Sequence, residues 1–360
     1  MRTTVPEEFF TSGKWFGDVY DGICRRHGLK TECVDSYEEY LNWKIEVRAV
    51  LREITGMSKL SKIPLLPKKL GETREEDHIR EKWVIQTCPD VWMPFYVLTP
   101  LDKKDKMPCV IATHGHDCGG KLAVAHRTDI PAVKDKIEKY NYTYGIELVR
   151  RGFVVFCPDA RGFGERREPC GQSERESDYV GSTCSVLNNV AICLGLSLTG
   201  LWIWDLMCLV DYVATRDECD FASLSCAGLS GGGLQCLWLS ALDDRIQRAV
   251  VSGYFYGYRD SLLDMPENCS CNYVPGLWAE VDMGDLGALI APRPLLVESG
   301  DEDVLNGARG VINTVEQVEI ARVAYRLCDA EENLRHHVFN NEHMWCGEEA
   351  YPFLTAGLDL

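Results

Sequence analysis

The stretch Gly228-Leu229-Ser230-Gly231-Gly232 decides the fold of this 360-residue chain. An apolar run precedes it over 224–229, and apolar residues at helical spacing follow it over 234–242. This order predicts a strand, a tight turn and a helix. A side chain at the tip of such a turn sits on a strained backbone, so small residues must flank it, and glycines do so here. The G-x-S-x-G pattern in this setting indicates a nucleophilic serine, Ser230, facing the positive end of the helix.

Bulk composition limits the class of protein. The hydrophobic fraction of 46% and the aromatic fraction of 10% are typical of a globular chain. The formal net charge of −17, from 38 basic and 55 acidic residues, argues against nucleic acid and anionic membranes as partners. The charge favours a neutral, small-molecule substrate, or simply serves solubility. Whether the chain forms a homo-oligomer stays open.

Cysteine usage and the chain start bear on location. The 17 cysteines are scattered through predicted strands and helices, which is typical of reduced, buried thiols rather than a disulfide framework. The segment 1–10 has no apolar core of signal-peptide length. We expect a cytoplasmic protein. Segment 186–213 is apolar, but polar residues such as Asn188 and Asp205 interrupt it, so we predict a buried crossover helix preceded by a loop, not a membrane span.

The chain is predicted to have two parts. Residues 1–80 are expected to form a helical N-terminal extension, because apolar residues recur at helical spacing between Tyr37 and Ile54 before Pro64 and Pro67 break the pattern. Residues 81–360 are expected to form the catalytic domain.

Strands and helices alternate in that second part. An antiparallel pair at 83–87 and 95–98 comes first, and the later elements are strands at 108–113, 153–157, 246–251, 294–299 and 334–339 and helices at 144–151 and 315–327. The fold class is therefore α/β, with a mostly parallel, doubly wound sheet covered by helices on both faces. Ligands of such sheets bind beyond the carboxyl ends of the strands.

A histidine must activate the serine. A serine hydroxyl becomes an effective nucleophile when a histidine takes its proton and a carboxylate orients that histidine. Chains with this serine turn place the acid and then the histidine downstream. Among the three histidines after Ser230, His336 and His337 lie within strand 334–339, whereas His343 follows it in a loop. We expect His343 to be the general base.

The acid is expected just after strand 294–299. Asp301, Glu302 and Asp303 all follow Gly300 there. We predict Asp303, whose spacing leaves room for the chain to turn toward the histidine, and keep Asp301 as the alternative.

The loop at 114–121 (His-Gly-His-Asp-Cys-Gly-Gly-Lys) is expected to complete an oxyanion hole. Two backbone N–H groups are needed, and we assign them to Gly231 and His116. The rival reading is a metal site, with ligands drawn from His114, His116, Asp117, Cys118, Cys269 and Cys271. The spacing is not that of a tight zinc motif and no C-x-x-C pair is near. We therefore expect no metal and no other cofactor.

These motifs, and four more, resemble those of the α/β-hydrolase superfamily, and more closely its acetyl xylan esterase-like and dienelactone hydrolase-like branch. The further motifs are Thr113 to His116, Asp159 to Arg166, Ile290 to Pro294 and Glu342 to Trp345. The resemblance covers roughly residues 80–350 and implies a Ser230–Asp303–His343 triad and no cofactor. It departs at His116, where acetyl xylan esterases tend to carry Tyr, and at Asn341-Glu342, where Gly-Gly is common.

The leading hypothesis is a serine esterase that cleaves short-acyl esters, such as acetylated carbohydrate or aryl esters, through an acyl-serine. The aromatic-rich segment 254–290 is expected to form a lid or a pocket wall. Two alternatives stay open. One is a serine peptidase of the oligopeptidase-like type, and the other is a non-catalytic binding protein on the same fold.

Overall fold

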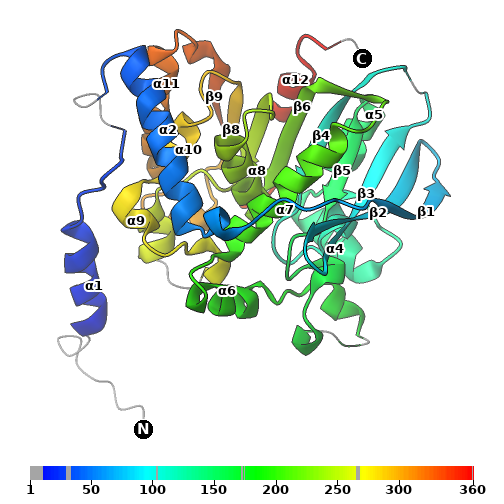
Figure 1. Ribbon diagram of the computed structural model, residues 1–360, viewed down its shortest axis with the longest axis horizontal. Helices are drawn as coiled ribbons and strands as arrows, with labels where there is room; N and C mark the ends of the chain where they lie inside the picture. The colour runs from blue at the N-terminus through cyan, green and yellow to red at the C-terminus, as the bar shows by residue number, and fades with distance from the viewer. Residues whose placement is uncertain are drawn as a thin grey trace.

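A nine-stranded sheet forms the centre of the computed structural model (Figure 1). The structure describes residues 11–358 and 360, apart from 30–33, 103, 172, 174 and 265–267. The strands are β1 Lys68–Arg74, β2 His78–Cys88, β3 Val91–Pro100, β4 Met107–Thr113, β5 Val154–Pro158, β6 Cys219–Leu229, β7 Arg248–Ser252, β8 Leu295–Gly300 and β9 Leu334–Phe339.

Their order in the sheet is β1-β2-β3-β5-β4-β6-β7-β8-β9. The first three strands and β5 pair antiparallel, and every pair from β5 to β9 is parallel. The predicted mostly parallel sheet is confirmed. Its carboxyl edge carries the loops that contain Ser230, Asp303 and His343.

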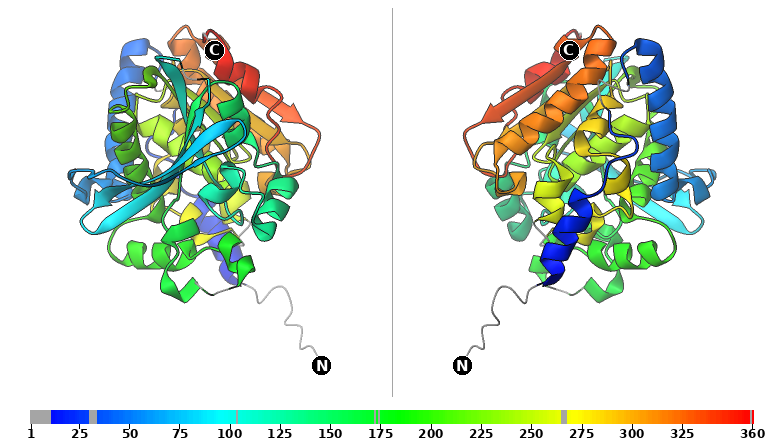
Figure 2. Two further views of the ribbon diagram at one scale, coloured as in Figure 1. Left: turned by 90° about the vertical axis from the view of Figure 1, so that its right-hand side faces the viewer. Right: turned by 90° about the vertical axis from the view of Figure 1, so that its left-hand side faces the viewer.

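Helices cover the sheet on both faces (Figure 2). The helices of the described residues are α1 Thr11–Asp21, α2 Tyr37–Ile54, α3 Lys121–Val124, α4 Pro131–Tyr140, α5 Tyr144–Arg150, α6 Cys184–Cys193, α7 Leu198–Val213, α8 Gly231–Leu242, α9 Leu277–Glu280, α10 Met283–Ala288, α11 Val311–Leu327 and α12 Ala350–Thr355, and α1 lies away from the sheet in Figure 1. One core packs α2, α7, α8, α10 and α11 against the sheet, and a second packs α3, α4, α5 and α12 on the opposite face. The central strands are mainly apolar because helices cover both of their faces.

The N-terminal region differs from the predicted helical extension 1–80. Helices α1 and α2 are present, but β1 lies at 68–74 and β2 begins at His78, so this region also supplies the edge of the sheet. The strand was missed because its sequence, Lys-Lys-Leu-Gly-Glu-Thr-Arg, is exposed along its length and has no apolar alternation. Charged side chains suit such an edge, since they discourage pairing with another chain.

Helix α2 is fixed to the main body. The hydroxyl of Tyr40 donates to the carbonyl oxygens of Ala288 (2.8 Å) and Ala291 (3.0 Å). Arg48 donates to both carboxylate oxygens of Asp244. Figures 1 and 2 show α2 beside α10 and α11. The N-terminal region is thus continuous with the core that supports the sheet.

The crossover 186–213 forms two helices rather than the single helix with a preceding loop that the sequence predicted. Helices α6 and α7 meet at a break where Gly195 has a φ of +66°. Ser197 starts α7 by accepting a hydrogen bond from the Gly200 N–H. Among the described residues, no single helix is long and apolar enough to cross a membrane. Only α6 and α7 together, bent by 103°, pass on length and composition.

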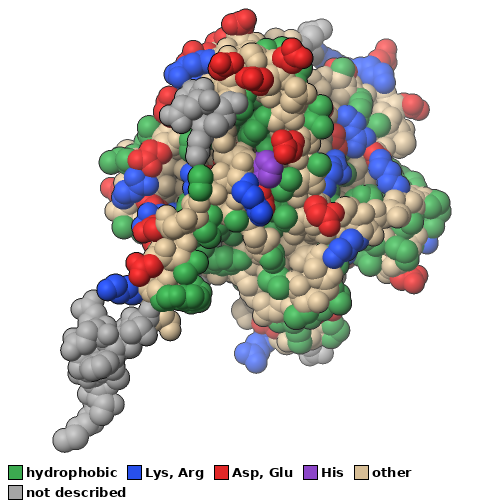
Figure 3. All heavy atoms as spheres, turned by 60° about the vertical axis from the view of Figure 1, so that its left-hand side comes forward, with side chains coloured by type: hydrophobic (Ala, Val, Ile, Leu, Met, Phe, Trp, Pro, Cys, Tyr) green, Lys and Arg blue, Asp and Glu red, His purple; other side chains and the backbone are tan. Residues whose placement is uncertain are grey.

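Charged side chains of both signs are interspersed over the face in Figure 3. The expected absence of nucleic-acid and membrane partners stays a prediction from net charge.

Candidate active site

Ser230 lies at the tip of the turn between β6 and α8. Its backbone has φ 60° and ψ −123°, which a residue other than glycine rarely adopts. The turn is tight: a Cβ atom on Gly228 would lie 2.3 Å from Thr113 Oγ1, and one on Gly232 would lie 2.3 Å from Thr113 O. The flanking glycines are therefore required by contact, as the sequence predicted.

Asp303 and His343 meet at the carboxyl edge of the sheet. The Nδ1 atom of His343 lies 2.7 Å from Oδ2 of Asp303. Because an ionised carboxylate only accepts, the imidazole donates from Nδ1. In this tautomer Nε2 carries no hydrogen, so it can accept the proton of the serine. The second oxygen of Asp303 accepts from the N–H of Leu305 at 2.9 Å. The Asp303 side chain is buried, whereas the His343 side chain is 18% exposed.

The alternative acid Asp301 has another role. Its side chain is exposed and accepts hydrogen bonds from the Asn341 N–H and the Asn340 side chain. It thereby holds the loop that carries His343. Of the three acidic residues after β8, the structure brings only Asp303 to the imidazole.

Two glycines make room for the histidine loop. A Cβ on Gly253, which has a φ of +58°, would lie 2.9 Å from Cε1 of His343. A Cβ on Gly300 would lie 2.4 Å from Asn341 O. Sequence reasoning missed Gly253, because a single glycine after a strand carries no distinctive pattern.

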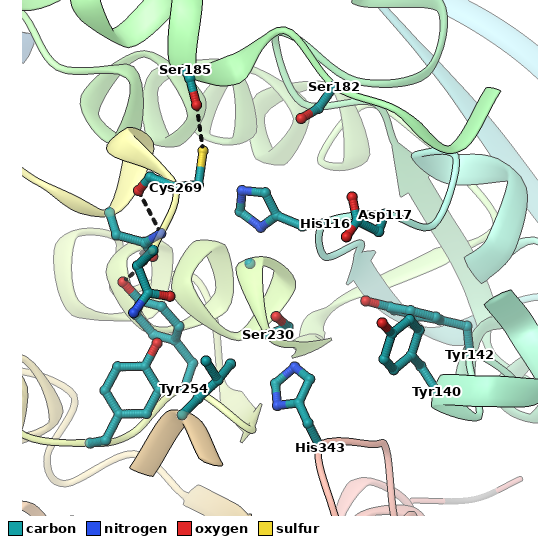
Figure 4. Close-up of a pocket in the computed structure, with 15 residues that line it drawn as sticks. His116, Asp117, Tyr140, Tyr142, Ser182, Ser185, Ser230, Tyr254, Cys269 and His343 are labelled. Carbon is teal, nitrogen blue, oxygen red and sulfur yellow. Dashed lines mark hydrogen bonds between the residues drawn. The ribbon is translucent and has the colours of Figure 1, made fainter. Parts of the chain in front are cut away.

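The ring of His343 points toward Ser230 in Figure 4, and both residues line a cavity of about 430 Å³. Polar groups dominate its lining. Besides these two residues, it includes His116, Asp117, Tyr140, Tyr142, Ser182, Ser185, Tyr254, Asn268, Cys269 and Asn272. Segment 254–290 supplies Tyr254, Asn268, Cys269 and Asn272, so this segment forms part of the pocket wall.

The expected oxyanion loop lies against the serine turn. A Cβ on Gly231 would lie 2.7 Å from Nδ1 of His116, and one on Gly115 would lie 3.1 Å from Cβ of Ser230. Glycine at 115 and 231 therefore permits the approach of two backbone segments to one point. The assignment of the Gly231 N–H and the His116 N–H as oxyanion donors stays a prediction.

Residues of the sequence motif 159–166 form hydrogen bonds to the 114–121 loop. His114 Nε2 accepts from the N–H of Ala160 at 3.0 Å. The carboxylate of Asp159 accepts from the N–H and the ammonium of Lys121. Burial acts to lower the pKa of Lys121, but the carboxylates of Asp159 and Glu165 outweigh it and raise that pKa. Residues Asp159 and Ala160 of this motif therefore hold the 114–121 loop in position.

The same motif contributes a buried ion pair. Arg161 and Arg166 both bind Asp205 of α7, at 2.7 and 2.8 Å. Burial acts to raise the pKa of Asp205, yet the two guanidinium groups hold it well below its usual range. The motif 290–294 has a similar supporting role, because Arg293 donates to the carbonyl oxygen of Ser240 near the end of α8.

Glu298 lies in β8 and is fully buried. One of its oxygens accepts from the N–H of Gly347, in the segment after His343. Burial raises the pKa of Glu298 to about 7. The Glu298 side chain therefore holds the backbone of the segment that follows His343.

The metal ligands weighed from the sequence are only partly brought together. His114 bonds to Ala160, and the Cys118 thiol donates to the Gly115 carbonyl oxygen. His116, however, lies 3.1 Å from the sulfur of Cys271, and Cys184 and Cys269 are next to them. Cys184 was missed because nothing in the sequence connects it to the 269–271 segment.

Comparisons with solved structures show the fold class of this protein. The fold and the serine turn are those of an α/β-hydrolase. A protein of Bacteroides fragilis NCTC 9343 described as an acetyl xylan esterase superposes with a TM-score of 0.74 at 18% identity, covering 98% of this chain and 91% of that one. A methylesterase, BT1017, gives 0.65 at 20% identity over 96% and 68% of the two chains. These similarities show the fold.

The family follows from sequence. A family model described as the abhydrolase family matches residues 31–359, and the chain belongs to that family. A relative in Bacillus subtilis (strain 168), YtaP, which is described only as a hydrolase, is 27% identical over 254 residues, which are 69% of this chain and 78% of that protein.

Proposed function

We propose that this chain is a serine esterase that cleaves short-acyl esters of polar alcohols, such as acetylated carbohydrates. The observation that carries the proposal is that Ser230 and His343 line one polar pocket, while Nδ1 of that histidine lies 2.7 Å from Oδ2 of Asp303. The resemblance to esterase folds is consistent with it.

The reaction proceeds in two halves. Ser230 Oγ attacks the ester carbonyl carbon while His343 takes the hydroxyl proton, and the backbone N–H groups of Gly231 and His116 stabilise the oxyanion. The carbon–oxygen bond to the alcohol then breaks, and His343 returns the proton to the leaving alkoxide. Water attacks the acyl-serine with His343 again as the base, which releases the acid and free serine. Asp303 orients the imidazole and stabilises its positive charge throughout.

The substrate class follows from the pocket. A cavity of about 430 Å³ is much larger than an acetyl group, so the alcohol part of the ester would occupy most of it. The residues that line the cavity include the hydroxyl-bearing Tyr140, Ser182 and Tyr254 and the amide-bearing Asn268. Such groups suit an alcohol with several hydroxyls, and the rings of Tyr140 and Tyr254 suit a flat sugar face.

A substrate panel tests this proposal. The chain is given acetyl and butyryl p-nitrophenyl esters, acetylated xylo-oligosaccharides, a methyl ester of a sugar acid and aminoacyl anilides. We expect acetate release from the oligosaccharides and a kcat/KM that falls from acetyl to butyryl. Ser230→Ala should lose turnover, while Ser225→Ala, in the same strand, should keep it. Preference for anilides would overturn the proposal in favour of a peptidase.

We also propose a cytoplasmic location. The described cysteines form no disulfide, as expected in a reducing compartment. Fractionation of the source cells tests this, and recovery outside the cytoplasm would contradict it.

A further inference from the structure

Four metal-ligating side chains converge beside the pocket. They are His116, Cys184, Cys269 and Cys271, and their ligand atoms all lie within 4.8 Å of one another. His116 comes from the loop after β4, Cys184 begins α6, and the other two flank Ser270 in the segment before α9. Cys184 and Cys271 are buried, whereas His116 and Cys269 are half-buried and line the cavity.

The contacts within this cluster are close. Nε2 of His116 lies 3.1 Å from Sγ of Cys271, and the sulfurs of Cys184 and Cys269 are 3.0 Å apart. In a tetrahedral zinc site with bonds of about 2.3 Å to sulfur, neighbouring ligand atoms are about 3.8 Å apart. Because the four ligand atoms lie between 3.0 Å and at most 4.8 Å apart, each separation is within about 1 Å of that value.

Each sulfur also has its own polar neighbour. Ser182 Oγ lies 3.3 Å from Cys184 Sγ, and Ser185 Oγ lies 3.2 Å from Cys269 Sγ. The side-chain amide of Asn272 donates toward Cys271 Sγ at 3.9 Å. A hydroxyl can donate to a thiolate as well as accept from a thiol, so these three neighbours could stabilise and orient metal-bound sulfurs.

We propose that His116, Cys184, Cys269 and Cys271 form a zinc site that fixes one wall of the active-site pocket. Three sulfurs and one imidazole match the soft ligand set that zinc prefers, and four protein ligands leave no open position for substrate. The role is therefore structural. Zn²⁺ binds the sulfurs as thiolates, so each bound thiol releases its proton to solvent on metal binding.

The position of the site gives it a consequence for the pocket. His116 also supplies one of the backbone N–H groups assigned to the oxyanion hole. A metal bond at Nε2 would fix the ring of His116, and with it the loop whose backbone lies against the serine turn (Figure 4). Zinc would also join α6 to the 269–271 segment, two parts of the pocket wall.

Metal content tests the proposal directly. The full chain is purified in a non-chelating reductant from zinc-supplemented cells, and zinc is measured by elemental mass spectrometry. We expect about one zinc per chain. Cys269→Ser and Cys271→Ser should each lose most of it, while Cys193→Ser, an exposed cysteine on the same helix as Cys184, should keep it. Ser230→Ala should keep it as well, so the metal result is independent of the proposed esterase activity.

Cobalt provides a second readout that does not depend on how the variants fold. Stripped wild-type chain titrated with Co²⁺ should develop the visible absorption of tetrahedral cobalt and the near-ultraviolet charge-transfer band of cobalt–thiolate bonds, with saturation at about one equivalent. A wild-type chain that holds no zinc and takes up neither ion would overturn the proposal. So would a disulfide between Cys184 and Cys269 in the non-reduced peptide map, which would explain the short sulfur–sulfur distance without a metal.

Discussion

His343 Nδ1 lies 2.7 Å from Asp303 Oδ2, although the two residues are 40 positions apart in the chain. The loops after β8 and β9 bring them together, because these parallel neighbours end at the same edge of the sheet. His343 points toward Ser230, which follows β6, two strands away from β8 (Figure 4). The sheet order thus explains why three distant side chains meet.

Asp303→Asn should reduce kcat by about 10³ to 10⁴-fold with little loss of stability. The amide can still accept from Leu305 N–H, but its NH₂ group favours the wrong tautomer of His343. Steady-state kinetics and thermal unfolding measure the two effects. Glu302→Gln, an exposed carboxylate after the same strand, is the matched control, and a comparable loss there would contradict the assignment of Asp303.

Gly253→Ala should lower kcat by at least about tenfold, since its new Cβ would lie 2.9 Å from the His343 ring. Gly276→Ala is the control. Gly276 also has a positive φ, but a Cβ there meets nothing within 4 Å. Both variants should lose about 1–2 kcal/mol of stability to the backbone alone. Equal activity in the two variants would argue against the contact with His343.

Glu298→Gln should change how stability depends on pH. Because the pKa of Glu298 is raised from 4.5 to about 7 by burial, the folded state binds the proton more tightly than the unfolded state. The wild-type free energy of unfolding should therefore fall as pH rises through 4.5 to 7, by about 3 kcal/mol at most. The amide variant, which keeps an oxygen for Gly347 N–H, should lack this fall.

Urea unfolding at pH 5, 6, 7 and 8 measures that difference. Glu302→Gln, an exposed carboxylate after the same strand, serves as the control and should behave as wild type. An identical pH slope in Glu298→Gln and wild type would contradict the assignment.

Asp205→Asn should cost about 3–5 kcal/mol of stability at neutral pH, because it leaves two guanidinium groups without a buried counter-charge. The pKa of Asp205 is depressed in the folded state, so this contribution is present above the unfolded-state pKa and is lost as pH falls below it. Asp129→Asn, which breaks the exposed pair with Arg127, should cost less than about 1 kcal/mol. Equal costs, measured by denaturant unfolding, would argue against the buried pair.

Much of the fold could be predicted because its signals are local. Strand β9 spans the predicted 334–339, and the glycines around Ser230 are required by contacts under 3 Å. His343 was chosen over His336 and His337 because ligands of such sheets bind beyond the carboxyl ends of the strands. The structure places His336 and His337 within β9. Strand β1 could not be found, because an exposed, charged edge strand has no hydrophobic pattern.

The cysteine cluster shows the other limit of sequence reasoning. The sequence offered His116, Cys269 and Cys271 as ligands, but the fourth group, Cys184, lies on a different element and 85 residues from Cys269. Only the packing of α6 against the 269–271 segment brings it in. Ligand sets assembled from separate elements leave no spacing motif.

Labelling of the nucleophile tests the central claim most directly. The chain is treated with a fluorophosphonate, and intact mass followed by peptide mapping locates the adduct. The account predicts one adduct per chain, on Ser230, with none on Ser230→Ala and strongly slowed labelling of His343→Ala. Labelling that persists in Ser230→Ala, or an adduct mapped to another residue, would contradict it.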